Sequence, residues 1–202
     1  MTEGDSAAID VVFGIAGKSL PSEHAYALWH ATVRWLPWLG AEPRAGIHRL
    51  RTAPTGYGVA LLANRAKLTL RVPQRRLAEA LLLAGRTLEV GGSRLAVGGG
   101  TARALRPWAT LHAEHVAAGA AGEAGFEDEV AQWLKALGVA ADFITGRRRR
   151  VMAGEREVVG FSVVLHGLAP EASLQMQCEG MGADRALGCG IFIPHKAIAT
   201  AR

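Results

Sequence analysis

Cysteine is scarce in this sequence, with only Cys178 and Cys189 among 202 residues. Two cysteines cannot form the disulfide framework of a small secreted domain, so a reducing compartment is expected. No apolar run reaches the ~18 residues that a membrane span needs, because Arg, Gly or Glu interrupts every candidate. The first ten residues carry three acids and no base, which is the wrong charge for a signal peptide. We therefore expect a cytoplasmic protein with no membrane partner.

Charged residues are also few, at 20% of the chain, whereas apolar residues make up 50%. This balance supplies enough apolar side chains for a buried core and excludes an intrinsically disordered protein. Because domains usually run to about 100–150 residues, the length fits one large domain or two small ones.

Lysine is the rare basic residue, since nineteen of the 23 basic residues are arginine and only four are lysine. Arginine presents a planar fork of donors that suits phosphate, and it stacks on bases. The net charge is +7 over residues 1–110, −5 over 111–142 and +3 over 143–202. This uneven distribution fits a polyanionic partner such as nucleic acid, although GC-rich coding also favours arginine over lysine.

The order of the expected elements repeats once along the chain. The first half is expected to contain strand 9–16, helix 21–39, strands 47–51 and 68–72, helix 74–84 and hairpin strands 87–90 and 94–97. The second half is expected to contain strand 110–116, helix 126–137, strands 142–145 and 158–165, helix 170–179 and strand 189–193. Both halves follow the βαββαβ order of the ferredoxin-like fold. Since Gly98-Gly99-Gly100 is typical of a linker, we predict an α+β protein of two tandem ferredoxin-like (RRM/RAMP-type) domains, 1–97 and 101–202.

A glycine-rich segment runs from Gly180 to Gly190 and contains Gly182, Arg185 and Gly188. Four glycines in eleven residues let backbone N–H groups approach a ligand closely, and an anionic backbone is the usual ligand. The spacing is not that of a dinucleotide-binding loop, because Arg185 occupies the position of the last glycine. An ordinary flexible loop is the alternative interpretation.

Several short motifs follow one another in a fixed order along nearly the whole chain. Those in the N-terminal half are Gly17-Lys-Ser-Leu-Pro-Ser-Glu-His24, Tyr26-Ala-Leu28 and Leu68-Thr-Leu-Arg71-Val-Pro73. Those in the C-terminal half are Arg149-Arg150-Val151, Val159-Gly160-Phe161, Gly167-Leu168, Glu171-Ala-Ser173-Leu174, Gly180-Met-Gly182 and Gly188-Cys-Gly-Ile-Phe-Ile-Pro194. Together they resemble the CRISPR-associated repeat-processing endoribonucleases, the Cas-six family of the RAMP superfamily, and above all its compact type I-MYXAN subgroup.

The resemblance implies two ferredoxin-like domains and metal-independent cleavage of CRISPR precursor RNA within each repeat, without a cofactor. It implies products with a 5′-hydroxyl and a 2′,3′-cyclic phosphate. This chemistry needs a base for the 2′-hydroxyl, an acid for the 5′-oxygen and positive charge beside the phosphorane. The alternative is a non-catalytic RAMP subunit that holds guide RNA in a CRISPR effector complex. CRISPR repeat RNA is the expected partner in both cases, and other effector subunits are partners in the second.

His24 is the first candidate for acid–base catalysis among the seven histidines. It follows Pro21 in the expected first turn of a helix, whose dipole keeps a neutral imidazole available near pH 7. The resembled family commonly places its catalytic histidine in or near this helix. His48, on an expected strand, is the second candidate, whereas His30 falls on the solvated face of the helix. Lys18 is the candidate for stabilising transition-state charge, with a solvated turn lysine as the alternative.

The candidate RNA contacts are basic residues and the glycine-rich segment. A run of arginines is usually a solvated turn, but in a protein that binds RNA it favours phosphate contact. These candidates are Arg147, Arg148, Arg149, Arg150, Gly180, Gly182, Arg185, Gly188, Gly190 and Lys196. No metal site is expected, because an i, i+3 histidine pair at 112 and 115 points to opposite faces of a strand.

Overall fold

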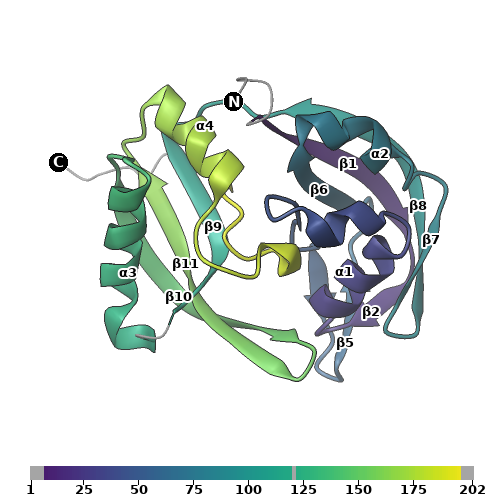
Figure 1. Cartoon of the computed structure of the whole chain (residues 1–202). Coiled ribbons are helices and arrows are strands. Elements are labelled where there is room, and N and C mark those ends of the chain that lie inside the picture. Colours follow the sequence, from purple (N-terminus) through teal and green to yellow (C-terminus); the bar gives the residue numbers. More distant parts are fainter. Residues whose placement is uncertain (1–6, 120–121, 197–202) are drawn as a thin grey trace. The chain divides into compact units, whose positions relative to one another are not determined.

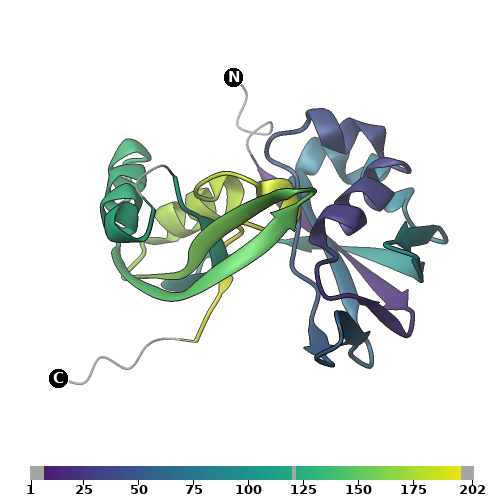
Figure 2. The ribbon, with the colours of Figure 1, turned by 90° about the horizontal axis from the view of Figure 1, so that it is seen from below.

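The computed structural model describes residues 7–119 and 122–196. The chain divides into two compact units, Met1–Ala104 with Met152–Arg156, and Leu105–Val151 with Glu157–Arg202. Each unit is built on an antiparallel sheet with helices packed against it (Figure 1, Figure 2). None of the helices in the described part of the chain is long and apolar enough to cross a membrane.

The first unit contains a five-stranded sheet in the order β3-β6-β1-β8-β7. Its strands are β1 (Ala8–Ala16), β3 (Gly46–Ile47), β6 (Lys67–Pro73), β7 (Thr87–Val90) and β8 (Ser93–Ala104), and its helices are α1 (Ala25–Val33) and α2 (Leu77–Leu81). Short 3₁₀ turns lie at Pro37–Ala41 and Gln74–Arg76. The chain order β1-α1-β3-β6-α2-β8 combined with this sheet order is the ferredoxin-like arrangement.

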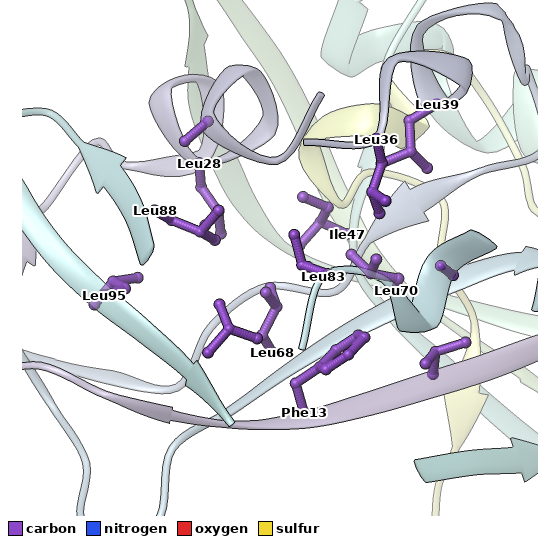
Figure 3. Packing of buried hydrophobic residues seen from close by; sticks show 14 of the residues in the cluster. Phe13, Leu28, Leu36, Leu39, Ile47, Leu68, Leu70, Leu83, Leu88 and Leu95 are labelled. Atoms are coloured by element: carbon purple, nitrogen blue, oxygen red, sulfur yellow. The ribbon is translucent and has the colours of Figure 1, made fainter. Parts of the chain in front are cut away.

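The core of this unit lies between the sheet and its helices. Alternate residues of a strand point to one face, so Phe13 of β1 and Leu68 and Leu70 of β6 are buried together with Leu28 of α1 (Figure 3). Burying a leucine or phenylalanine side chain stabilises a fold by about 1.5–3 kcal/mol. This apolar face therefore holds α1, and the residues that begin it, against the sheet.

The first unit also contains a small three-stranded sheet that the sequence did not predict. One of its strands ends at the residue where the first helix was expected to begin. Its order is β2-β5-β4, with β2 at Ser19–Pro21, β4 at Thr52–Pro54 and β5 at Val59–Leu62. The prediction that Pro21 opens a helix is wrong, because Pro21 ends β2 and pairs with Val59. The prediction of a continuous helix to residue 39 is also wrong. Leu36 precedes a proline, which disfavours helical backbone, and its φ of −126° and ψ of 73° separate α1 from the following 3₁₀ turn.

The three glycines at 98–100 lie within β8 rather than in a linker. Gly100 pairs with Phe13 of β1, and a Cβ at position 100 would collide with the Phe13 ring. Glycine is needed here because the buried ring occupies the space above the neighbouring strand. The boundary between the two units instead falls after Ala104.

The second unit repeats the arrangement with a four-stranded sheet in the order β10-β11-β9-β12. Its elements are β9 (Thr110–Ala117), α3 (Gly122–Ala136), β10 (Asp142–Ala153), β11 (Arg156–His166), α4 (Pro170–Glu179) and β12 (Ile193–Pro194). The core includes Phe126 of α3 and Phe161 of β11, whose ring centroids are 4.7 Å apart. The last strand is shorter than the expected 189–193, because only Ile193 and Pro194 pair with β9.

Candidate active site

His24 immediately precedes α1 and occupies its N-cap position. Its side chain is half-buried, and its Nδ1 lies 2.9 Å from the carbonyl oxygen of Pro21. Because a carbonyl oxygen only accepts hydrogen bonds, Nδ1 must carry the proton. The neutral imidazole therefore keeps a lone pair on Nε2, which is the form that a general base needs.

The surroundings of His24 favour this neutral form. Burial lowers the pKa of His24 below its ordinary value of 6.5, and the positive charge of Arg49 lowers it further. The backbone hydrogen bonds to Pro21 and Ser22 and the charge of Glu23 act in the opposite direction without cancelling the effect. His24 is consequently deprotonated over most of the range near neutral pH.

Arg49 is the functional candidate that the sequence did not reveal. It follows β3, and its side chain is exposed. Its proximity to His24 arises only when the chain after β3 folds beside the start of α1, so no sequence motif marks it. A guanidinium close enough to shift the pKa of the candidate base is suited to stabilising negative charge that develops nearby.

Lys18 is exposed and lies in the bend between β1 and β2. The three residues of β2 and two more separate it from His24, so the two residues lie at opposite ends of that strand. This separation corresponds to roughly 10 Å of extended chain along β2. The structure therefore does not place these two candidates side by side.

His48 belongs to a charge network around the buried Asp10 and Arg71. Its Nε2 lies 3.3 Å from Oδ1 of Asp10. Arg71, which is opposite Asp10 in the sheet, donates from Nε to Oδ1 at 2.8 Å and from Nη2 to Oδ2 at 3.0 Å. Burial alone raises the pKa of Asp10, but the hydrogen bonds from His48 and Arg71 outweigh it and hold the pKa far below its ordinary value.

The arginine run at 147–150 lies in strand β10 and not in a turn. Arg149 is 3.8 Å from Glu114, and Arg150 is 3.4 Å from Glu157. Arg147 and Arg148 are exposed, and neither side chain has an ion pair or hydrogen bond within residues 7–119 and 122–196. Their charges are therefore available to an external anion. Lys196, which follows β12, is exposed as well.

Arg185 uses its guanidinium inside the protein. Nη1 donates to the carbonyl of Glu179 at 3.0 Å, and Nη2 donates to those of Cys178 at 3.0 Å and Gln177 at 3.2 Å. These carbonyls lie in the last turn of α4, where a cation also interacts favourably with the helix dipole. Arg185 thus caps α4, a role that its position among glycines did not suggest.

The glycines around Arg185 also meet requirements of the fold itself. Gly180 ends α4 with a φ of 72°, and a Cβ there would collide with the Arg185 guanidinium. A Cβ on Gly190 would collide with the backbone of Met181, and one on Gly182 would press on the carbonyl of Ala117. Close packing of the segment on itself and on β9 accounts for these glycines. Their contact with RNA, like that of Gly188, stays a prediction.

Replacing Arg185 with alanine is expected to lower the free energy of unfolding by ~1–3 kcal/mol. The substitution leaves carbonyl groups at the end of α4 without their donor, and an unsatisfied buried group costs about that much. Urea denaturation measures the loss, with Arg148→Ala as an exposed control that should unfold like the wild type. An RNA contact by Arg185 would in addition reduce the salt dependence of RNA binding by about one phosphate, so the two roles are separable.

No group of three or more His, Cys, Asp or Glu residues in the described ranges is arranged to hold a metal ion. The family of this chain follows from a comparison with known protein families. The Cas6 CRISPR family model matches residues 9–197, nearly the whole chain. The chain belongs to the Cas6 family. It is 38% identical over 187 residues to the CRISPR-associated endonuclease Cas6 of Myxococcus xanthus strain DK1622, which covers 92% of this chain and 81% of that protein.

Solved structures agree with this Cas6 assignment at the level of the fold. A RAMP protein described as binding different RNA substrates superposes with a TM-score of 0.65 at 14% identity, covering 92% of this chain and 98% of that one. A Cas6-related protein from Pyrococcus furiosus gives a TM-score of 0.64 at 13% identity, covering 93% and 97%. The predicted family and the predicted tandem ferredoxin-like fold are both confirmed.

Proposed function

We propose that this Cas6 protein is a cytoplasmic endoribonuclease that cleaves CRISPR precursor RNA within its repeats to release guide RNA. The observation that carries the proposal is the 38% identity, over 92% of the chain, to a protein named a CRISPR-associated endonuclease. The half-buried His24 with its lowered pKa supports it, because RNA cleavage through the 2′-hydroxyl needs a base that is neutral near pH 7.

In the proposed reaction, Nε2 of His24 takes the proton of the 2′-hydroxyl, and the 2′-oxygen attacks the adjacent phosphorus. The bond to the 5′-oxygen then breaks, and that oxygen leaves with a proton from a second acid or from solvent. The products carry a 2′,3′-cyclic phosphate and a 5′-hydroxyl. Positive charge beside the phosphorane stabilises the transition state, and Arg49 is the proposed source. Lys18 lies at the other end of β2 from His24, and it is proposed to contact another phosphate of the RNA. Because the substrate supplies its own nucleophile, the reaction is proposed to need neither metal nor cofactor.

The RNA backbone is proposed to contact the exposed cations of the second unit. Arg147 and Arg148 of β10 and Lys196 after β12 are the residues whose exposure suits this role. Arg149 and Arg150 face carboxylates at 3.8 Å and 3.4 Å, so each would exchange a partner on binding. Surface pairs of this kind contribute little to stability, and phosphate can therefore displace the carboxylates at small cost.

The test is incubation of the protein with its own repeat RNA in the presence of EDTA. Cleavage at one position within the repeat, with cyclic phosphate and 5′-hydroxyl ends, supports a metal-independent endoribonuclease. A gel shift without products supports the second candidate, a RAMP subunit that holds guide RNA in an effector complex without cutting it. The RNA-binding RAMP protein among the structural neighbours motivates this second candidate.

The pH profile of single-turnover cleavage provides a further prediction. If His24 is the general base, the rate should stay nearly constant from about pH 8 to the ordinary histidine pKa of about 6.5 and fall only below it, because its pKa is lowered. Protonation at more acidic pH removes the lone pair on Nε2 and with it the base. His30→Ala should reproduce this profile, and a rate that rises steadily on acidification would contradict the base assignment.

A further inference from the structure

The most exposed large apolar side chain in the described part of the chain is Tyr57, at 90%. It lies in the loop between β4 and β5, flanked by Gly56 and Gly58 at φ of 86° and 69°. Thr55 closes the loop, because its backbone N–H and its hydroxyl both donate to the carbonyl of Val59, at 3.0 Å and 2.7 Å. A tyrosine ring carries 150–250 Å² of largely apolar surface. A closed loop thus presents this whole ring to solvent.

The exposed apolar surface continues from Tyr57 along β5. Val59 is 38% exposed and Leu61 is 49% exposed, whereas Ala60 between them is buried at 2%. Alternation along the strand puts Val59 and Leu61 on the same, solvent-facing side of the small sheet. β2 and β5 lie beside each other at the lower edge of the first unit in Figure 1. Tyr57 therefore stands at the end of an exposed strip and not as an isolated surface residue.

Backbone contacts connect the Tyr57 loop to His24. The N–H of Ser22 donates to the carbonyl of Gly58 at 2.9 Å, and Pro21 pairs with Val59. The carbonyl of that same Pro21 accepts the hydrogen bond from Nδ1 of His24. One strand pairing thus positions both the exposed ring and the candidate base.

The stretch of chain that contains β4 and β5 has charge of one sign only. Residues 43–78 contain eight basic residues and no acidic one. Arg71, Arg75 and Arg76 are paired with carboxylates from outside this stretch. Arg51, which directly precedes β4, and Lys67, which begins β6, are exposed, and Lys18 precedes β2. Lys18 and Arg51 lie at the Leu62 end of β5, because the Leu62 N–H donates to the carbonyl of Lys18 and Leu62 pairs with Thr52. The exposed strip that begins at Tyr57 therefore leads along β5 to cations that can bind a polyanion.

An exposed aromatic ring joined by one strand to exposed cations is a combination that suits single-stranded nucleic acid. Bases stack on the ring while phosphates contact the cations, and stacking tolerates any base. The core of a protein–protein interface is instead depleted of charged residues and is more apolar than the rest of the surface. Single-stranded RNA is therefore the better match for this surface.

We infer that Tyr57 is a stacking platform for one unpaired nucleotide beside the scissile phosphate, and that Lys18 and Arg51 contact phosphates farther along the RNA, at the Leu62 end of the small sheet. The inference rests on the proposed function, because it takes His24 as the point of cleavage. Tyr57 acts as a positioning residue. It holds the nucleotide so that the 2′-hydroxyl faces the base, and it takes no part in proton transfer.

The experiment uses repeat RNA made uncleavable by a 2′-deoxy substitution at the cut, with 2-aminopurine placed in turn on either side of it. The fluorescence of 2-aminopurine falls when the base stacks. Wild type and Y57F should quench the probe at one of the two positions, and Y57A should not. Y57A should also weaken RNA binding by about 5- to 150-fold, the usual range for one base–aromatic stack. L82A, which removes another exposed apolar side chain (64%) of the same unit, should match the wild type.

Equal quenching and equal affinity for Y57A and wild type would overturn the inference. Because Tyr57 is almost fully exposed, Y57A should keep the wild-type unfolding temperature, which is measured alongside. Cleavage of unmodified repeat RNA by the wild type first maps the cut. Absence of cleavage there refutes the proposed nuclease, whereas cleavage at one position without Tyr57-dependent quenching overturns only the stacking inference.

Discussion

Replacing His24 with alanine is expected to slow single-turnover cleavage of repeat RNA by ~10²–10⁴-fold, the usual contribution of general acid–base catalysis. The affinity for RNA should change little, because one neutral imidazole adds little beside several arginine–phosphate contacts. Stability should also hold approximately, since a half-buried side chain at the start of α1 leaves no large cavity. Quenched-flow or gel-based single-turnover assays with enzyme in excess measure the effect.

The control for this prediction is His30→Ala, six residues along the same segment. His30 is exposed and contacts the Tyr26 ring at 4.3 Å between centroids, so its removal should leave cleavage nearly normal. A deoxy substitution at the cleaved nucleotide should abolish cutting by the wild type, because it removes the nucleophile. If His24→Ala cleaves at the wild-type rate while His48→Ala does not, the catalytic role belongs to His48 and the argument from the Pro21 hydrogen bond is wrong.

Replacing Asp10 with alanine is expected to lower the free energy of unfolding by ~3–5 kcal/mol, the usual cost of leaving a buried charge without its partner. Arg71 is fully buried at 0% exposure. Its Nε and Nη2 both donate hydrogen bonds to the carboxylate of Asp10. The same pair makes stability depend on pH. Because the pKa of Asp10 is lowered by folding, the pair stabilises the fold fully above the unfolded-state pKa of about 3.9 and progressively less as pH falls below it.

Urea denaturation at pH 7 and at pH 3 tests this prediction, with Glu89→Ala as the matched control. Glu89 also pairs with an arginine in the first unit, but both side chains are exposed, at 54% and 75%, so its loss should cost under ~1 kcal/mol. A double variant, Asp10→Leu with Arg71→Met, should recover much of the stability because it removes both buried charges. An Asp10→Ala variant as stable as Glu89→Ala would show that the buried pair contributes nothing.

The elements that the sequence predicted well are those with one dominant local signal. The apolar, β-branched run at 9–16 forms β1 almost to the residue, and the helix opened by Pro170 has the expected bounds. The small sheet was missed because its strands have only three or four residues, too few for a periodic pattern. Pro21 was misinterpreted because a proline can begin a helix or end an edge strand, and β2 is too short for its pattern to distinguish the two.

Candidate site residues could be named from the sequence only where the residue type itself indicates a chemical role. His24 was a candidate from the sequence because few side chains titrate near neutral pH, and its catalytic role stays a prediction. Arg49 could not, because its proximity to His24 depends on where the chain after β3 runs. Arg185 was read as an RNA contact because its neighbours are glycines, yet those glycines make room for its guanidinium to reach the carbonyls of α4.

The continuity of β8 through Gly98–Gly100 determines where this chain can be divided. Ile9, Val11 and Phe13 of β1 pair with Ala104, Ala102 and Gly100. A first half ending at Val97 would therefore leave most of β1 as an unpaired strand edge, which is a template for aggregation with other chains. A tag inserted between the two halves should therefore follow Ala104, although the three glycines suggest a flexible joint.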